Sequence, residues 1–85
     1  MPVISRFYGI VISMKTHDHP PPHFHVKYAE HQCAVSIATC LIIDGSIPDR
    51  AYRLVQEWRE LHRREFEENW SRFEAELSLL PIDPI

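Results

Sequence analysis

The sequence predicts an α+β domain in which a small antiparallel sheet of three to four strands precedes one long amphipathic helix, straight or kinked. Two observations lead to this prediction. Before residue 45, β-branched and aromatic residues form short runs, one of which alternates cleanly with polar residues. After Pro48, apolar residues recur every three or four positions instead. With 85 residues, we expect a single domain: sheet about 3–45, helix about 48–77 and an extended tail 78–85.

The strands are bounded by polar and proline-rich segments. The best strand signal is 23–29, where Phe24, Val26 and Tyr28 point to one face and the residues between them to the other. A stiff connection containing Pro20-Pro21-Pro22 precedes this strand. The other expected strands are the apolar runs 7–14, 33–38 and 40–43.

The helix begins near Pro48, which suits a first helical turn, and no Gly or Pro interrupts residues 49–77. A straight helix of this length would measure on the order of 40 Å. Because a four-stranded sheet cannot cover that length, we expect part of the apolar stripe to meet a second copy in a homo-oligomer. The apolar, proline-rich tail is expected to lie extended on the core.

Composition excludes some classes of partner. The net charge is −3, which argues against a general nucleic-acid or membrane surface, because both need clustered Lys and Arg. No apolar run approaches the ~20 residues of a membrane span. No secretory leader precedes Arg6, and two cysteines, Cys33 and Cys40, are too few for a disulfide framework. We therefore expect a cytoplasmic protein with reduced thiols.

Several motifs together resemble a widespread bacterial family of small domains of unknown function. They are the opening 4–12 (ISRFYGIVI), Asp18-His19, the block 21–26 (PPHFHV), Glu57-Trp58 with Leu61-His62, and Asn69-Trp70. Members look like proteins encoded beside a second small protein, as in toxin–antitoxin pairs. The resemblance implies a toxin-like role and an antitoxin-like partner, and it implies a glycine in the turn after Tyr28, where this chain has 29–32 (AEHQ).

A histidine cluster is the candidate site. His23 and His25 share one strand face about 6–7 Å apart, and can act as base and acid in RNA cleavage because the histidine pKa lies near 6.5. Arg6 and Lys27 are the candidate phosphate-binding residues, with Asp18 and His19 as further binding candidates. The same block can instead hold a divalent metal such as zinc, through His17, His19, His23 and His25. The third alternative is that these imidazoles are structural.

His62 lies on the apolar stripe of the helix, four residues after Trp58. It is either a core histidine packed on Trp58 or a third catalytic residue brought towards His23 and His25, with Glu65 orienting its ring. Two functions follow from these alternatives. The first is a toxin-like component that acts through the histidine cluster, with RNA as a candidate target. The second is a non-catalytic binding or adaptor domain, either with or without a bound metal.

Overall fold

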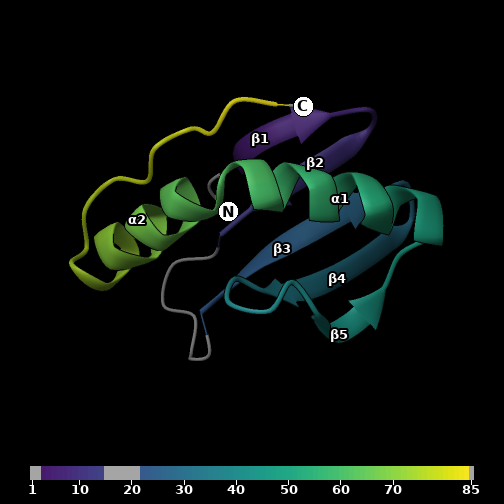
Figure 1. Cartoon of the computed structure of the whole chain (residues 1–85), viewed down its shortest axis with the longest axis horizontal. Helices are drawn as coiled ribbons and strands as arrows, with labels where there is room; N and C mark the ends of the chain where they lie inside the picture. Colours follow the sequence, from purple (N-terminus) through teal and green to yellow (C-terminus); the bar gives the residue numbers. More distant parts are fainter. Residues whose placement is uncertain (1–2, 15–21, 85) are drawn as a thin grey trace.

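A five-stranded antiparallel sheet and two helices make up the fold in the computed structural model, which describes residues 3–14 and 22–84. The strands lie in chain order across the sheet, as Figure 1 shows. The α+β class is therefore confirmed. The elements are β1 Val3–Phe7, β2 Ile10–Ser13, β3 His23–Tyr28, β4 His31–Ser36, β5 Ile42–Ser46, α1 Asp49–Leu61 and α2 Arg63–Glu74.

The sheet has five strands rather than the expected three to four because the apolar run 7–14 is not one strand. Tyr8 and Gly9 adopt φ values of 49° and 80°, and Phe7 pairs with Ile10 across this two-residue loop. Positive φ at both loop positions is the signature of a type I′ hairpin turn. The run is therefore divided between the end of β1 and the whole of β2.

The next hairpin turn lies at the position where the family resemblance implied a glycine. Tyr28 pairs with His31, and Ala29 between them has φ 53°. A left-handed conformation favours glycine because it has no Cβ to clash with the backbone. The turn thus keeps its geometry with alanine, at some cost in free energy.

The helical segment divides at His62 and does not continue as the expected single helix 48–77. His62 has φ −120° and ψ 24°, and its backbone N–H donates to the carbonyl oxygens of Trp58 and Arg59. The division lets aromatic side chains of both helices reach the sheet: the Phe66 ring centroid lies 4.8 Å from that of Trp58 and 4.5 Å from that of Phe24. Most of the apolar stripe is covered within the chain, but Leu61 and Leu77 are 71% and 56% exposed. Contact with a second copy therefore stays a prediction.

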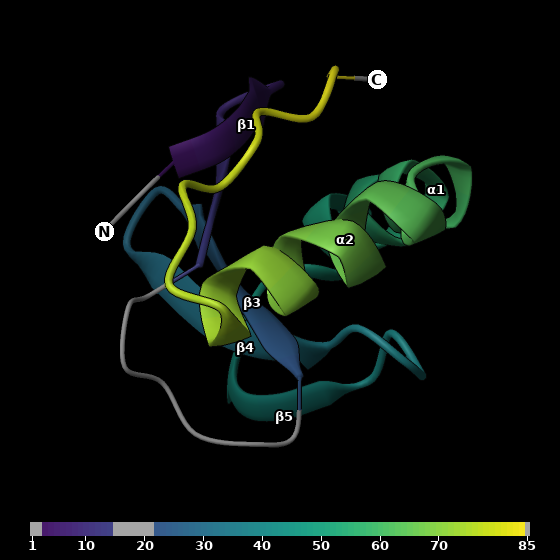
Figure 2. The same cartoon turned by 90° about the vertical axis from the view of Figure 1, so that its left-hand side faces the viewer.

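Both helices lie on one face of the sheet, where the core forms (Figures 1 and 2). Phe24 and Val26 from β3 and Trp58 and Phe66 from the helices are at most 1% exposed. The other face of the sheet carries no helix. That difference between the two faces determines which side chains of each strand remain available to a ligand.

The C-terminal segment runs from the end of α2 back to β1, as the yellow trace in Figure 2 shows. The Ile82 N–H donates to the Ile4 carbonyl at 2.8 Å, and the Ile82 side chain is buried. The indole N–H of Trp58 donates to the Asp83 carbonyl at 2.7 Å. The tail therefore closes the open side of the core next to the edge strand.

In the part of the chain that the structure describes, neither helix is long and apolar enough to cross a membrane.

Candidate functional site on the outer sheet face

The outer sheet face is the face opposite the helices. Strand pairing fixes its members: His25 lies opposite Ser13 on β2 and Ala34 on β4, and Lys27 lies opposite Val11 and Gln32 in the same way. Because side chains alternate along a strand, His23, His25 and Lys27 project away from Phe24 and Val26. The polar residues that pairing places on this face are Arg6, Ser13, His23, His25, Lys27, Gln32, Ser36, Asp44 and Ser46.

His23 and His25 lie in direct ring contact. Their ring centroids are 5.1 Å apart and the planes meet at 77°, as the alternation of the strand predicts. The His23 side chain is buried, and its ring centroid lies 6.0 Å from that of Trp70 on α2. His25 is half-buried. The pair thus combines one imidazole held by packing with a second that is more open to solvent.

A hollow of about 190 Å³ borders His25, the more open member of this pair. Ser13, His25, Lys27, Gln32 and Asp44 contribute its polar side chains, and they come from four different strands. A hydroxyl, an imidazole, an ammonium and a carboxylate therefore border one space the size of a few water molecules. This set offers donors and acceptors of both charges to a small polar group.

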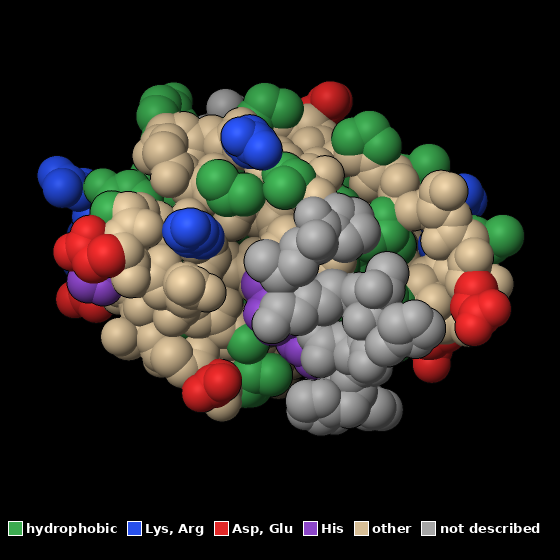
Figure 3. Space-filling model, turned by 180° about the vertical axis from the view of Figure 1, so that it is seen from behind, with side chains coloured by type: hydrophobic (Ala, Val, Ile, Leu, Met, Phe, Trp, Pro, Cys, Tyr) green, Lys and Arg blue, Asp and Glu red, His purple; other side chains and the backbone are tan. Residues whose placement is uncertain are grey.

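The two candidate phosphate-binding residues lie on the same face as the histidines. Arg6 pairs with Val11, and Val11 pairs with Lys27. Two strand spacings therefore separate Arg6 from Lys27, which places their backbones about 10 Å apart. Figure 3 views this side and shows histidine side chains at the border of the grey atoms, with basic side chains on the same side.

His62 lies in a different environment, at the junction of α1 and α2. Its ring centroid is 5.9 Å from that of Trp58, and its Nδ1 atom lies 2.7 Å from Oε1 of Glu65. The expected pairing with Glu65 is present. The ring contact with Trp58 is what the core alternative predicts, and the contact with Glu65 is what the catalytic alternative predicts. The role of His62 therefore stays a prediction.

The metal hypothesis depends partly on residues outside the described ranges. His17, Asp18 and His19 all lie in 15–21, which the structure does not describe. Among residues 3–14 and 22–84, no group of three or more His, Cys, Asp or Glu side chains is placed to hold a metal ion. His23 and His25 alone bring two imidazoles together there.

Both cysteines are free and buried. Burial raises the pKa of the Cys33 thiol from 9.0 to about 11 and also raises the pKa of Cys40. A thiolate is the form that binds metal or attacks an electrophile, so these thiols are poor ligands and poor nucleophiles at neutral pH.

Strand pairing brought in residues that the sequence alone did not single out. Ser13 lies in the apolar run 7–14 and Asp44 directly follows the run 40–43, 31 positions away, yet both border the hollow beside His25. Alternation along each strand could have indicated which face these two side chains occupy. It could not show that they lie beside His25, because that depends on the register between β2, β3, β4 and β5.

The fold and the site together define a small α+β domain with a histidine pair on β3, in which the His23 ring is buried near Trp70 of α2 and His25 borders the hollow on the outer sheet face. The chain belongs to DUF4160, a domain of unknown function, whose family profile matches residues 9–71. No curated protein and no solved structure matches the chain significantly.

Proposed function

We propose that this protein is the toxin-like component of a bacterial two-gene module and that it cleaves RNA through His23 and His25. The observation that carries the proposal is the 5.1 Å separation of the two imidazole centroids on β3. The toxin role itself comes from the family resemblance. In this proposal the protein acts in the cytoplasm, and a neighbouring small antitoxin-like protein holds it in check.

The chemistry needs one neutral and one protonated imidazole. The neutral ring removes the proton from a ribose 2′-hydroxyl, whose oxygen then attacks the adjacent phosphorus. The protonated ring gives its proton to the departing 5′-oxygen, which leaves a 2′,3′-cyclic phosphate and a 5′-hydroxyl. Because an imidazole can act as either base or acid, two adjacent histidines can divide these roles.

Charge on the same face supports the proposal. Lys27 borders the hollow next to His25, where its ammonium group can stabilise the negative charge that builds up on the phosphorane. Arg6, two strands away, can hold the next phosphate, because phosphates in a single strand are separated by several ångströms. Asp44 on the far side of the hollow opposes phosphate binding and would place the substrate nearer to Lys27.

The test uses His→Gln substitutions, because glutamine is polar and close to histidine in size. Induced expression of the wild-type protein should slow growth, and the double variant His23→Gln/His25→Gln should restore it. His31→Gln is the matched control, because His31 is a histidine at the β3–β4 turn, next to Glu30 and away from the hollow. Circular dichroism of each variant checks that the fold persists.

Purified protein provides the chemical part of the test. Wild-type and His31→Gln protein should release fragments with 2′,3′-cyclic phosphate ends from single-stranded RNA, and the double variant should lose this activity by about a hundredfold or more. Normal growth with the wild-type protein would eliminate the toxin role. Growth arrest without RNA cleavage would support the toxin role but refute RNA cleavage as its reaction.

The second candidate is a non-catalytic domain that holds a metal. The adjacency of His23 and His25 supports it, because two imidazoles on one strand face can be two ligands of a zinc ion. His17, Asp18 and His19 would have to supply the remaining ligands. Metal analysis of protein purified without a polyhistidine tag separates the candidates: about one zinc per chain, lost in His23→Gln/His25→Gln, favours the metal-holding domain.

A further inference from the structure

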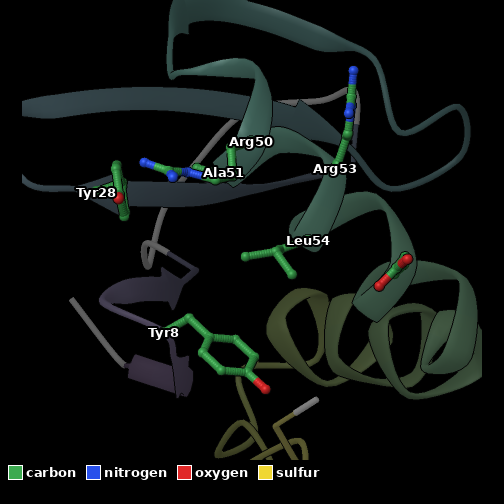
Figure 4. A pocket seen from close by; sticks show the side chains of 7 residues that line it. Tyr8, Tyr28, Arg50, Ala51, Arg53 and Leu54 are labelled. Atoms are coloured by element: carbon green, nitrogen blue, oxygen red, sulfur yellow. The ribbon is translucent and has the colours of Figure 1, made fainter.

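A second hollow lies on the helix side of the sheet, away from the histidine pair. Its volume is about 560 Å³, and it opens between the β1–β2 turn, the end of β3 and the first half of α1. Figure 4 shows Leu54 pointing into the space between these elements, with Tyr8 on the turn and Tyr28 on the strand at its borders. A space of this volume lies within the ~300–1,000 Å³ of small-molecule sites.

Tyr8 occupies a position where a tyrosine is costly. It has φ 49° in a type I′ turn, where asparagine is preferred at the same position and a bulky residue is strained. Its side chain is 69% exposed, so burial in the core does not offset this strain. Neither turn formation nor core packing therefore explains the aromatic ring. Contact between the Tyr8 ring and a ligand would explain why a tyrosine occupies this position.

Two arginines, Arg50 and Arg53, lie beside the tyrosines. Arg50 and Arg53 are exposed, and neither forms an ion pair or a hydrogen bond with any residue in the described part of the chain. Arg50 extends towards Tyr28, and Arg53 points towards the outside of the hollow (Figure 4). By contrast, three other arginines of the helices, Arg59, Arg63 and Arg72, each bind an oxygen of the protein. The guanidinium groups of this hollow are free to bind an anion.

A carboxylate completes the lining. Glu57 lies one helical turn after Arg53 and borders the same space. The hollow therefore combines aromatic rings, cations and one carboxylate. An acidic peptide would be repelled by the carboxylate, whereas a ligand with a flat ring, N–H donors and a separate anionic group would match all three.

We propose that this hollow binds a nucleotide. The base stacks on the ring of Tyr8 or Tyr28, the phosphate binds the guanidinium groups of Arg50 and Arg53, and Glu57 accepts an N–H of the base. The site is separate from the proposed cleavage centre, because Tyr28 alternates with Lys27 and so faces the helix side of the sheet. It does not require the histidine pair to be catalytic. The nucleotide is either free or part of an RNA strand.

The experiment titrates the whole protein with five probes and follows binding by backbone NMR shifts and calorimetry. The probes are the four ribonucleoside 5′-monophosphates and inorganic phosphate. At least one nucleotide should bind and shift the amide signals around Tyr8 and Arg50, and phosphate should bind at least tenfold more weakly because it has no base to stack. Equal affinity for phosphate, or binding by none of the nucleotides, overturns the proposal.

Variants locate the site. Tyr8→Asn keeps the turn, since asparagine is preferred there, and should weaken nucleotide binding about tenfold or more, as the loss of one stacking contact does. Arg50→Gln/Arg53→Gln should weaken it by a similar factor. Arg64→Gln, an exposed arginine on α2, removes one charge elsewhere and should bind like wild type. Unchanged affinity in both site variants would overturn the assignment.

Two comparisons complete the test. One distinguishes a free nucleotide from RNA, and the other distinguishes this hollow from the outer sheet face as the binding site. The first comparison uses a single-stranded RNA of four nucleotides. If this RNA binds at least tenfold more tightly than the monophosphates, with the same dependence on Tyr8, the natural ligand is RNA. If the affinities are equal, the natural ligand is the free nucleotide. With the wild-type protein, the monophosphates should shift the amide signals around Tyr8 and Arg50 and not those around His25 and Lys27. If the shifts gather around His25 and Lys27 instead, the nucleotide is held on the outer sheet face and the present proposal fails.

Discussion

The Arg59 guanidinium on α1 binds the Ile37 carbonyl oxygen through two nitrogens, Nε at 3.1 Å and Nη2 at 2.6 Å. Nη2 also lies 2.6 Å from the carbonyl oxygen of Ala38, and the Arg59 residue is only 6% exposed. A buried charged group therefore satisfies the backbone of the loop that follows β4. This contact joins the helical layer to the loop between the last two strands.

Replacing Arg59 by methionine should be strongly destabilising. Arg59→Met keeps the aliphatic packing but leaves the carbonyls of Ile37 and Ala38 without their donor, which should lower the free energy of unfolding by about 2–4 kcal/mol. Urea denaturation measures the loss. Arg63→Met is the matched control, because Arg63 pairs with Glu67 at the exposed surface and should change stability by less than about 1 kcal/mol. Equal losses in the two variants would contradict the role given to Arg59.

Asn69 attaches the C-terminal tail to α2. Its Nδ2 donates to the Leu80 carbonyl and its Oδ1 accepts from the Leu80 N–H, both at 2.8 Å, and the residue is fully buried. Asn69→Ala should cost about 2–3 kcal/mol, because two hydrogen bonds are lost and the Leu80 groups remain near the interior. Hydrogen exchange at the Leu80 amide should accelerate more than exchange within β3. Unchanged protection at Leu80 would show that the tail is held by other contacts.

The two glycines offer a matched pair for testing backbone strain. Gly9 and Gly45 have similar φ values, 80° and 74°, but different surroundings. A Cβ at Gly45 would lie 2.3 Å from the Gln32 carbonyl oxygen, whereas one at Gly9 would meet only a Tyr28 ring atom at 3.7 Å. Gly9→Ala should therefore cost about 1–2 kcal/mol from the left-handed backbone alone. Gly45→Ala should cost at least about 2 kcal/mol more, because backbone must move as well. Thermal denaturation of both variants decides whether the close approach adds to the strain.

Alkaline pH should destabilise the protein in a defined range through its buried thiols. The pKa of Cys33 is about 11 in the folded chain against 9.0 in the unfolded one, so above pH 9 the unfolded state loses its proton first. The native state then binds more protons than the unfolded state, and stability falls as pH rises from about 9 through about 11. A shift of this size corresponds to on the order of 2 kcal/mol at most. Cys40 and Tyr52, whose pKa values burial also raises, act in the same direction.

Comparison with Cys33→Ala isolates this contribution. The variant should start from a lower stability at pH 7, because a buried side chain is truncated, but its stability should fall less steeply between pH 9 and pH 11. Urea denaturation at several pH values gives both slopes. Parallel curves for the two proteins would assign the alkaline loss to other groups.

The sheet was partly predictable from the sequence. The alternation in 23–28 located β3 and placed His23 and His25 on one face, because the side-chain period of a strand is local. The turn at Tyr8 was missed because the apolar run 7–14 continues through it, and a tyrosine at a left-handed position gives no turn signal. Only the strand pairing revealed that Phe7 turns back on Ile10.

For the helical segment, the sequence predicted the helical conformation but not its division at His62. Its apolar period correctly indicated helix from Asp49 onward, but nothing in the sequence marks His62 as a boundary, since no Gly or Pro lies near it. The division is decided by packing: Trp58 and Phe66 both have to reach the aromatic core around Phe24. Tertiary contacts of this kind override a weak local preference for continuing the helix.

By itself, the amino-acid sequence determined the α+β class, the adjacency of the two strand histidines and the polar character of their face, because each depends on residues close together in the chain. The tertiary structure alone decided that Ser13 and Asp44 join His25 around one hollow, and that His62 belongs to the helical layer. It also placed Tyr8, Tyr28 and Arg50 around a second hollow. These relationships depend on register between strands and on how the helices pack, which are set by contacts between residues far apart in sequence.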